Sequence, residues 1–92
     1  MGKTVLVKYM AHLPGITKKE EERVECESDL FLDALLQRIS SKYKDSPGGE
    51  AFESEFSLLT TLNGGFIPAS QWKETLLKDG DVVVLLPPVS GG

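Results

Sequence analysis

The sequence is short of several residue types, and each shortage excludes a class of protein. It has one cysteine, so no internal disulfide can form, as we expect of a cytoplasmic protein. No apolar run reaches the roughly 18 residues that a membrane-spanning helix needs. The only histidine, His12, stands apart from any cysteine cluster or paired carboxylate, which argues against a metal site or a catalytic dyad. We therefore expect a cytoplasmic protein with no metal site and no membrane contact.

A surplus of basic residues is also missing. Ten lysines and arginines stand against fourteen acidic residues, for a net charge of -4. Little positive charge is left to neutralise phosphates, so nucleic-acid binding is not expected. The apolar share of 40% and the charged share of 26% are ordinary for a globular domain. The length of 92 residues suffices for one hydrophobic core, and we expect a single domain.

Hydrophobic spacing and turn residues predict the order strand, strand, helix, strand, short strand, strand. Ser28 or Asp29 is expected to cap the helix. The strands are predicted within residues 4–10, 20–27, 56–62 and 82–86, with a short one from Phe66. Turns are predicted at 12–15 and 63–65, and a helical turn within 70–78. The helix is predicted from an apolar stripe of Leu32, Leu35, Leu36, Ile39 and Tyr43, and is broken by residues 45–49.

This order predicts an α+β protein of the ubiquitin-like β-grasp class, in which a mixed sheet of about five strands packs on one main helix over residues 1–86. Alternation places Val5, Val7 and Tyr9 toward the helix. The second strand is expected to turn Val24 and Cys26 inward and its acidic residues to solvent. The unbroken apolar run of the last strand suits the middle of a sheet.

Few other residues offer chemistry of their own. We expect His12 to be a solvated loop residue and Cys26 to be a small buried hydrophobe, not a nucleophile. Gly64 and Gly65 serve a turn, since no Gly-Lys-Ser/Thr sequence follows them as in a phosphate-binding loop.

The last six residues, Pro87-Pro88-Val89-Ser90-Gly91-Gly92, are predicted to form a tail outside the domain. The fixed φ angles of the two prolines hold the tail extended, and the two glycines lack a Cβ and can enter a narrow channel. The Gly92 carboxylate is a poor electrophile until a partner attaches a leaving group, most simply AMP from ATP. The resulting acyl-adenylate could receive sulfur or an amine, so a sulfur carrier and a protein modifier both remain open.

Two simpler interpretations of the ending also remain. A terminal Gly-Gly alone is equally typical of a frayed end. A passive β-grasp interaction module would have no use for the diglycine. An apolar strand followed by a Pro-Pro spacer favours a working tail over both, because several features then agree.

The segment from Asp79 to Gly92 closely resembles the end of the MoaD/ThiS family of ubiquitin-like sulfur carrier proteins. The helix around residues 32–36 and the hairpin at 62–67 are similar as well. The resemblance implies a β-grasp carrier that is not itself an enzyme and holds no bound cofactor. It implies that an adenylating enzyme, using ATP, activates Gly92, which is then thiocarboxylated.

The Pro87-Pro88-Val89 spacer looks most like that of molybdopterin synthase small subunits. This implies a second partner, the large subunit of molybdopterin synthase, whose active site receives the tail and where sulfur passes to a pterin precursor in molybdenum cofactor biosynthesis. Gly91 would then give clearance, Val89 and Ser90 would lie within the partner's channel, and Pro87 and Pro88 would set the reach of the tail. Sulfur carriage for thiamine or tRNA thiolation is the alternative pathway.

The outer face of the predicted sheet carries apolar residues. Leu6 and Met10 of the first strand and Val84 and Leu86 of the last strand are expected to point away from the helix, with Phe66 beside them. Exposed apolar clusters often mark interfaces. By resemblance, Met10, Phe66 and Leu86 match surface positions where the family meets its partners. The alternative is ordinary packing under a loop around Trp72 or Phe52.

Overall fold

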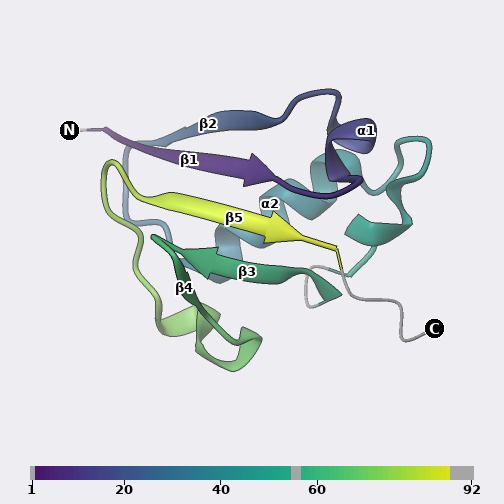
Figure 1. The fold of residues 1–92 in the computed structure, drawn as a ribbon. Coiled ribbons are helices and arrows are strands. Elements are labelled where there is room, and N and C mark those ends of the chain that lie inside the picture. The colour runs from purple at the N-terminus through teal and green to yellow at the C-terminus, as the bar shows by residue number, and fades with distance from the viewer. Residues whose placement is uncertain (1, 55–56, 88–92) are drawn as a thin grey trace.

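A five-stranded mixed sheet carries one long helix across one of its faces (Figure 1). The computed structural model describes residues 2–54 and 57–87. The strand order is β2-β1-β5-β3-β4, in which β1 and β5 are parallel and all other pairs are antiparallel. The strands are β1 (Lys3–Tyr9), β2 (Glu21–Cys26), β3 (Leu59–Leu62), β4 (Gly65–Phe66) and β5 (Val82–Leu86). The helices are α1 (Leu13–Thr17) and α2 (Leu32–Tyr43), with 3-10 turns η1 (Gly49–Phe52) and η3 (Ala69–Glu74). The predicted β-grasp fold is confirmed.

The turn expected at residues 12–15 contains the short helix α1. Pro14 lies in the first turn of α1, where the backbone N–H that proline lacks would have no partner within the helix. Lys18 ends the helix in the left-handed region, with a φ of 66°. Leu13 is fully buried and Ile16 is 7% exposed. Burial of these two side chains explains why the connection between β1 and β2 is helical.

Helix α2 has the predicted apolar stripe, and every member of the stripe is buried. The predicted cap is wrong, because the helix begins at Leu32 and neither Ser28 nor Asp29 contributes. The Leu32 backbone N–H donates instead to the Thr75 carbonyl oxygen at 2.8 Å. This bond belongs to a short antiparallel bridge that pairs Phe31 with Leu76. A contact from distant sequence therefore satisfies the helix start, which a local cap would otherwise do.

The connector after α2 contributes to the core, although its sequence is mostly polar. Phe52, at the end of η1, is fully buried. Its ring centroid lies 5.4 Å from that of Tyr43 and 6.4 Å from that of Tyr9. Aromatic rings at these separations attract one another beyond simple burial. The three rings fix the connector against the end of α2 and the end of β1.

The β3–β4 hairpin has the predicted turn, but β3 is shorter than expected. It begins at Leu59, after a bend at Leu58, so the prediction of strand over residues 57–58 is wrong. The turn is made by Asn63 and Gly64, with φ values of 51° and 90°. Two successive positive φ angles are typical of the two-residue turns that join twisted strands. The Asn63 Oδ1 also accepts the Val82 N–H at 2.9 Å, which ties the turn to the start of β5.

Strand β5 lies in the middle of the sheet, as predicted, between β1 and β3. Val83 and Leu85 are fully buried and face α2, while Val84 and Leu86 are half-buried on the other face. Trp72 joins the same core from η3, and its Nε1–H donates to the Ile67 carbonyl oxygen at 2.9 Å. The core thus fills the space between the inner face of the sheet and α2.

Candidate interaction surface and tail

The tail begins where the central strand of the sheet ends. Strand β5 finishes at Leu86, beside the end of β1 and the start of β3 (Figure 1). Pro87 follows and is half-buried. The other tail residues predicted to act, Pro88, Val89, Ser90, Gly91 and Gly92, lie outside the described residues. Their roles stay predictions.

The sheet face away from α2 carries a row of apolar side chains at this same end. Strand pairing places Leu59 of β3 opposite Leu86 of β5, and Met10 follows β1 with its N–H donating to the Leu85 carbonyl oxygen at 3.0 Å. The Phe66 side chain is 61% exposed and that of Met10 is 46% exposed. We call Met10, Leu59, Phe66, Val84 and Leu86 the outer patch.

The predicted orientation of Met10, Phe66 and Leu86 is confirmed, whereas their role in binding a partner stays a prediction. The alternative of packing under Trp72 or Phe52 is wrong. Both of those side chains are at most 1% exposed and belong to the core, so neither covers the outer face.

Leu59 is a patch residue that the sequence analysis missed. It is 39% exposed, while its neighbour Leu58 is 2% exposed. Two successive leucines leave alternation undecided about which of them faces outward. The two-residue turn resolves this, because it pairs Thr61 with Phe66 and so sets Leu59 on the same face as Phe66. Counting back from the turn would have found Leu59.

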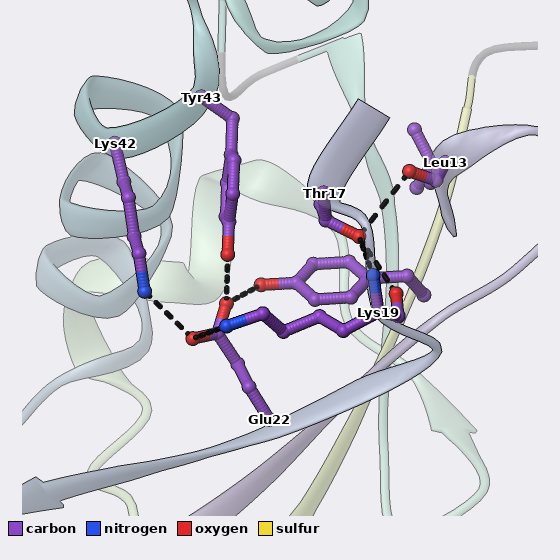
Figure 2. A network of polar contacts seen from close by, with 7 residues as sticks. Leu13, Thr17, Lys19, Glu22, Lys42 and Tyr43 are labelled. Carbon is purple, nitrogen blue, oxygen red and sulfur yellow. Dashed lines mark hydrogen bonds and ion pairs between the residues drawn. The ribbon is translucent and has the colours of Figure 1, made fainter. Parts of the chain in front are cut away.

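On the inner side of the same end, a carboxylate links three elements and the loop before β2. Glu22 of β2 is only 10% exposed, and its oxygens accept hydrogen bonds from Tyr9 Oη, from Tyr43 Oη at 2.6 Å and from Lys42 Nζ at 2.8 Å. Lys19 Nζ forms an ion pair with it at 3.6 Å. Figure 2 shows Lys19, Lys42 and Tyr43 converging on this carboxylate.

These contacts shift the pKa values of the groups involved. Burial raises the pKa of the Glu22 carboxyl, but hydrogen bonds from Lys42, Tyr43 and Tyr9 outweigh it and lower the pKa to about 2. The hydrogen bond to Glu22 raises the pKa of Lys42. Burial, followed by the contact with Glu22, raises the pKa of both Tyr9 and Tyr43. At neutral pH the Glu22 carboxylate and the Lys42 ammonium are therefore charged, both tyrosines keep their protons, and the network holds β1, β2 and α2 together.

Glu22 was expected on a solvated strand face, and that expectation is wrong. The register pairs Glu22 with Val7, which is fully buried, so its side chain lies on the inner face with Val24. The prediction for His12 is confirmed, and that for Cys26 is confirmed in part. His12 is exposed as expected, and Cys26 is half-buried against the core instead of fully buried.

Within residues 2–54 and 57–87, no group of three or more His, Cys, Asp or Glu side chains could hold a metal ion. No helix in that part of the chain is long and apolar enough to cross a membrane.

Comparison with known proteins adds independent evidence. The profile of the ThiS family matches residues 7–92. A search of curated proteins returns no significant match. The small archaeal modifier protein 1 of Methanosarcina acetivorans is 30% identical, with a TM-score of 0.70, and the alignment covers 100% of this chain and 99% of that one.

Two other solved structures extend the comparison. A protein assigned as molybdopterin converting factor subunit 1 of Pyrococcus furiosus is 26% identical, with a TM-score of 0.72, over 95% of this chain and 99% of that one. Urm1 of Trypanosoma brucei is 18% identical, with a TM-score of 0.67, over 99% and 97% of the two chains, and supports the fold alone.

Proposed function

The chain belongs to the ThiS family, and we propose that it is a sulfur carrier whose Gly92 carboxylate is adenylated and then thiocarboxylated by a partner enzyme. The observation that carries this proposal is the extent of the family match, which continues through the tail to residue 92. The outer patch supports it, because Met10, Leu59 and Leu86 of the patch lie at the end of the sheet where β5 passes into the tail.

The chemistry requires little of the carrier itself. A carboxylate oxygen attacks the α-phosphorus of ATP and pyrophosphate leaves, and a sulfur nucleophile then displaces AMP from the acyl carbon. The partner enzyme binds the ATP and holds the reacting groups, so the carrier needs no bound cofactor. What this chain supplies is a body that docks and a terminal carboxylate at the end of an extended arm. The protein is therefore a carrier that takes part in catalysis only within a complex.

For the pathway, we propose molybdopterin synthesis, with the large subunit of molybdopterin synthase as the second partner. The Pro87-Pro88-Val89 spacer and the similarity to the Pyrococcus furiosus protein support this choice. The single cysteine is consistent with a cytoplasmic location. Sulfur transfer for thiamine synthesis or tRNA thiolation would use the same tail.

A second candidate function is protein modification through Gly92. The 30% identity to a small archaeal modifier protein, over the full length of this chain, supports it. Both functions begin with the same adenylation, and they diverge only in the nucleophile that displaces AMP. A thiocarboxylate results from sulfur, and an isopeptide bond results from a lysine amine of another protein.

Intact mass spectrometry of the untagged protein from its own cells tests the two functions. A carrier is expected to be heavier by the mass difference between sulfur and oxygen. This added mass should be absent when Gly92 is deleted. Isopeptide adducts of the terminal Gly-Gly on other proteins, without any sulfur-containing species, would establish the modifier instead. An unmodified terminus, together with full pathway activity after deletion of Gly92, would refute both functions.

A further inference from the structure

Strand β2 forms an open edge of the sheet. It is the outermost strand on one side, whereas the strand at the opposite edge, β4, has only two residues (Figure 1). Strand β2 has six residues, and its pairing with β1 runs from Glu21 to Cys26 without a bulge. It contains neither proline nor glycine. A regular edge of this kind is a template for a further strand.

The backbone groups of β2 divide into two sets. In an antiparallel pair, residues that bond to the neighbouring strand alternate with residues that face away from it. The Tyr9 N–H donates to the Glu20 carbonyl oxygen at 2.8 Å, which makes the even-numbered residues of β2 the ones bonded to β1. Leu6, which lies opposite Arg23, donates its N–H to the Asp81 carbonyl oxygen ahead of β5, as this phase requires. The N–H and C=O groups that point away from β1 are those of Glu21, Arg23 and Glu25.

The side chains of these three residues form a row of mixed charge. They alternate with the inward residues Glu22 and Val24, so they lie on the outer face of the sheet, and all three are exposed. The row has one cation between two anions. A uniformly acidic edge would repel a copy of itself, whereas a mixed row is matched by a copy that places Arg23 opposite a glutamate.

The position of a two-fold axis decides which side chains meet when two copies of an antiparallel edge pair. An axis at Glu22, Arg23 or Glu25 places a charged side chain opposite its own copy, and like charges directly opposite destabilise a sheet. An axis at Val24 places Val24 opposite itself and Arg23 opposite Glu25 of the other copy, in both directions. Only this register combines an apolar contact at the centre of the inner face with two ion pairs on the outer face.

We propose that two copies of the protein pair antiparallel along β2, with Val24 at the two-fold axis, and so join their sheets into one continuous sheet. Each copy supplies the same strand, so the interface is self-complementary and closed. Pairing buries no unpaired charge on the inner face, because Glu22 is already bound by Lys19 and Lys42 of its own copy.

The dimer goes beyond the proposed function and does not depend on it. The chain leaves each sheet from β5, which β1 separates from the joined edge. The outer patch lies at the end of β1, β5 and β3, away from β2. A dimer would therefore present two tails and two patches at once.

Sedimentation velocity of the full-length, untagged chain measures the association. The wild type is expected to shift from monomer toward dimer between about 5 and about 500 µM, because one pair of strands makes a small interface. R23E and E25R should each raise the Kd at least about tenfold, since each places like charges opposite one another. The double variant R23E/E25R should return the Kd to within about threefold of the wild type, because both ion pairs form again with reversed sign.

K73E is the matched control, because it makes the same change of charge as R23E. Lys73 is exposed in η3, which follows β4 at the opposite edge of the sheet, so the Kd should stay within about twofold. E27Q should tighten the dimer, since this register places the exposed Glu27, just beyond β2, opposite Glu21 of the other copy. Circular dichroism melts check that every variant is folded.

Amide hydrogen exchange locates the contact. Protection of the outward N–H groups of Arg23 and Glu25 should rise with protein concentration, whereas the Val24 N–H is bonded to β1 in the monomer and should not change. A wild type that stays monomeric at about 500 µM would overturn the proposal. Association that persists in R23E, that R23E/E25R fails to restore, or that Leu59→Asp abolishes would overturn it as well, because the contact would then lie elsewhere.

Discussion

Single core residues differ in how well their polar atoms are satisfied. Thr60 of β3 is fully buried opposite Leu85, and its hydroxyl has no hydrogen-bond partner among the residues described. A buried hydroxyl without a partner loses its bonds to water and gains none in return. Thr60 lies in β3, between β5 and β4, and the fold forms in spite of this cost.

Thr60→Val is therefore expected to stabilise the protein by about 1 kcal/mol. The change removes the unsatisfied hydroxyl and keeps a β-branched side chain of similar shape. Urea unfolding gives the free energy of unfolding. Thr61→Val, on the half-buried outer side of the same strand, is the control and should change stability by less than about 0.5 kcal/mol. A loss of stability in Thr60→Val would show that the hydroxyl has a partner.

Two glycines provide an opposite pair of expectations. A Cβ at Gly49 would overlap the Tyr43 carbonyl oxygen and lie 2.7 Å from that of Lys44, whereas a Cβ at Gly15 meets nothing within 4 Å. Gly49→Ala should destabilise the protein by about 1–3 kcal/mol, because backbone atoms must move. Gly15→Ala, within α1, should stabilise it by about 0.5 kcal/mol. Differential scanning calorimetry of both variants compares their Tm values, and a rise for Gly49→Ala would contradict the close approach.

The sequence predicted the orientation of single strand residues well where apolar residues alternate regularly along the strand. Val5, Val7 and Tyr9 lie inward as alternation required. The same alternation places Glu22 inward, but a carboxylate is not expected in a core without partners. Those partners, Tyr9 and Tyr43, lie 13 and 21 residues away along the chain. Their convergence arises from tertiary packing, which no local pattern reveals.

At the scale of elements, the Glu22 carboxylate links β1, β2 and α2, and its ionisation couples their packing to pH. Its folded-state pKa of about 2 lies below the ordinary value of 4.5. The stabilising effect is therefore complete above about pH 4.5 and is lost as the pH falls toward 2. Acid should weaken this end of the sheet first.

Glu22→Gln tests this coupling. The substitution should destabilise the protein by about 1–2 kcal/mol at pH 7, and the difference from the wild type should shrink as the pH falls from 4.5 toward 2. Urea unfolding at a series of pH values measures both quantities. Glu21→Gln, on the exposed side of the same strand, is the control and should change stability by less than about 0.5 kcal/mol at pH 7. A difference that stays constant down to pH 2 would exclude the ionised carboxylate as the source.

Element boundaries were predictable only where local signals decide them. The Asn63-Gly64 turn and the end of α2 follow from residues with special backbone preferences, and both were predicted. The start of α2 was not, because the bridge between Phe31 and Leu76 takes over the role expected of Ser28 or Asp29. The start of β3 was also missed, since a bend at Leu58 leaves no mark in an apolar run.

At the scale of the whole molecule, the order of elements was sufficient to predict the β-grasp fold. The outer patch was predicted in part, because the strand faces follow from alternation while Leu59 requires the register of β3 against β5. The sulfur chemistry proposed for the tail came from resemblance, since the residues alone indicated an activated Gly92 carboxylate and left a carrier and a modifier both open. What the structure adds is the position of Leu86 and Pro87, where the chain leaves the sheet beside the patch residue Leu59.

The docking role of the patch makes a prediction about the molecule as a whole. Leu59 and Leu76 are both 39% exposed, but Leu59 lies in the patch and Leu76 lies beside Phe31 at the start of α2. Leu59→Asp should raise the KM for the carrier in ATP–pyrophosphate exchange at least tenfold, because a buried carboxylate would replace an apolar contact. Leu76→Asp should leave it within twofold, although the exposed area lost is the same.

Thermal melts establish that both variants fold, so that the comparison reports on binding. Phe66→Asp should behave like Leu59→Asp, since the two side chains share the outer face. Equal effects of Leu59→Asp and Leu76→Asp would mean that the enzyme contacts both ends of the molecule. A larger effect of Leu76→Asp would place the docking site at the start of α2. Leu59→Asp and Leu76→Asp together test whether the body docks beside its own tail. Transfer at Gly92 requires such docking, because the arm that carries Gly92 is formed by residues 87–92.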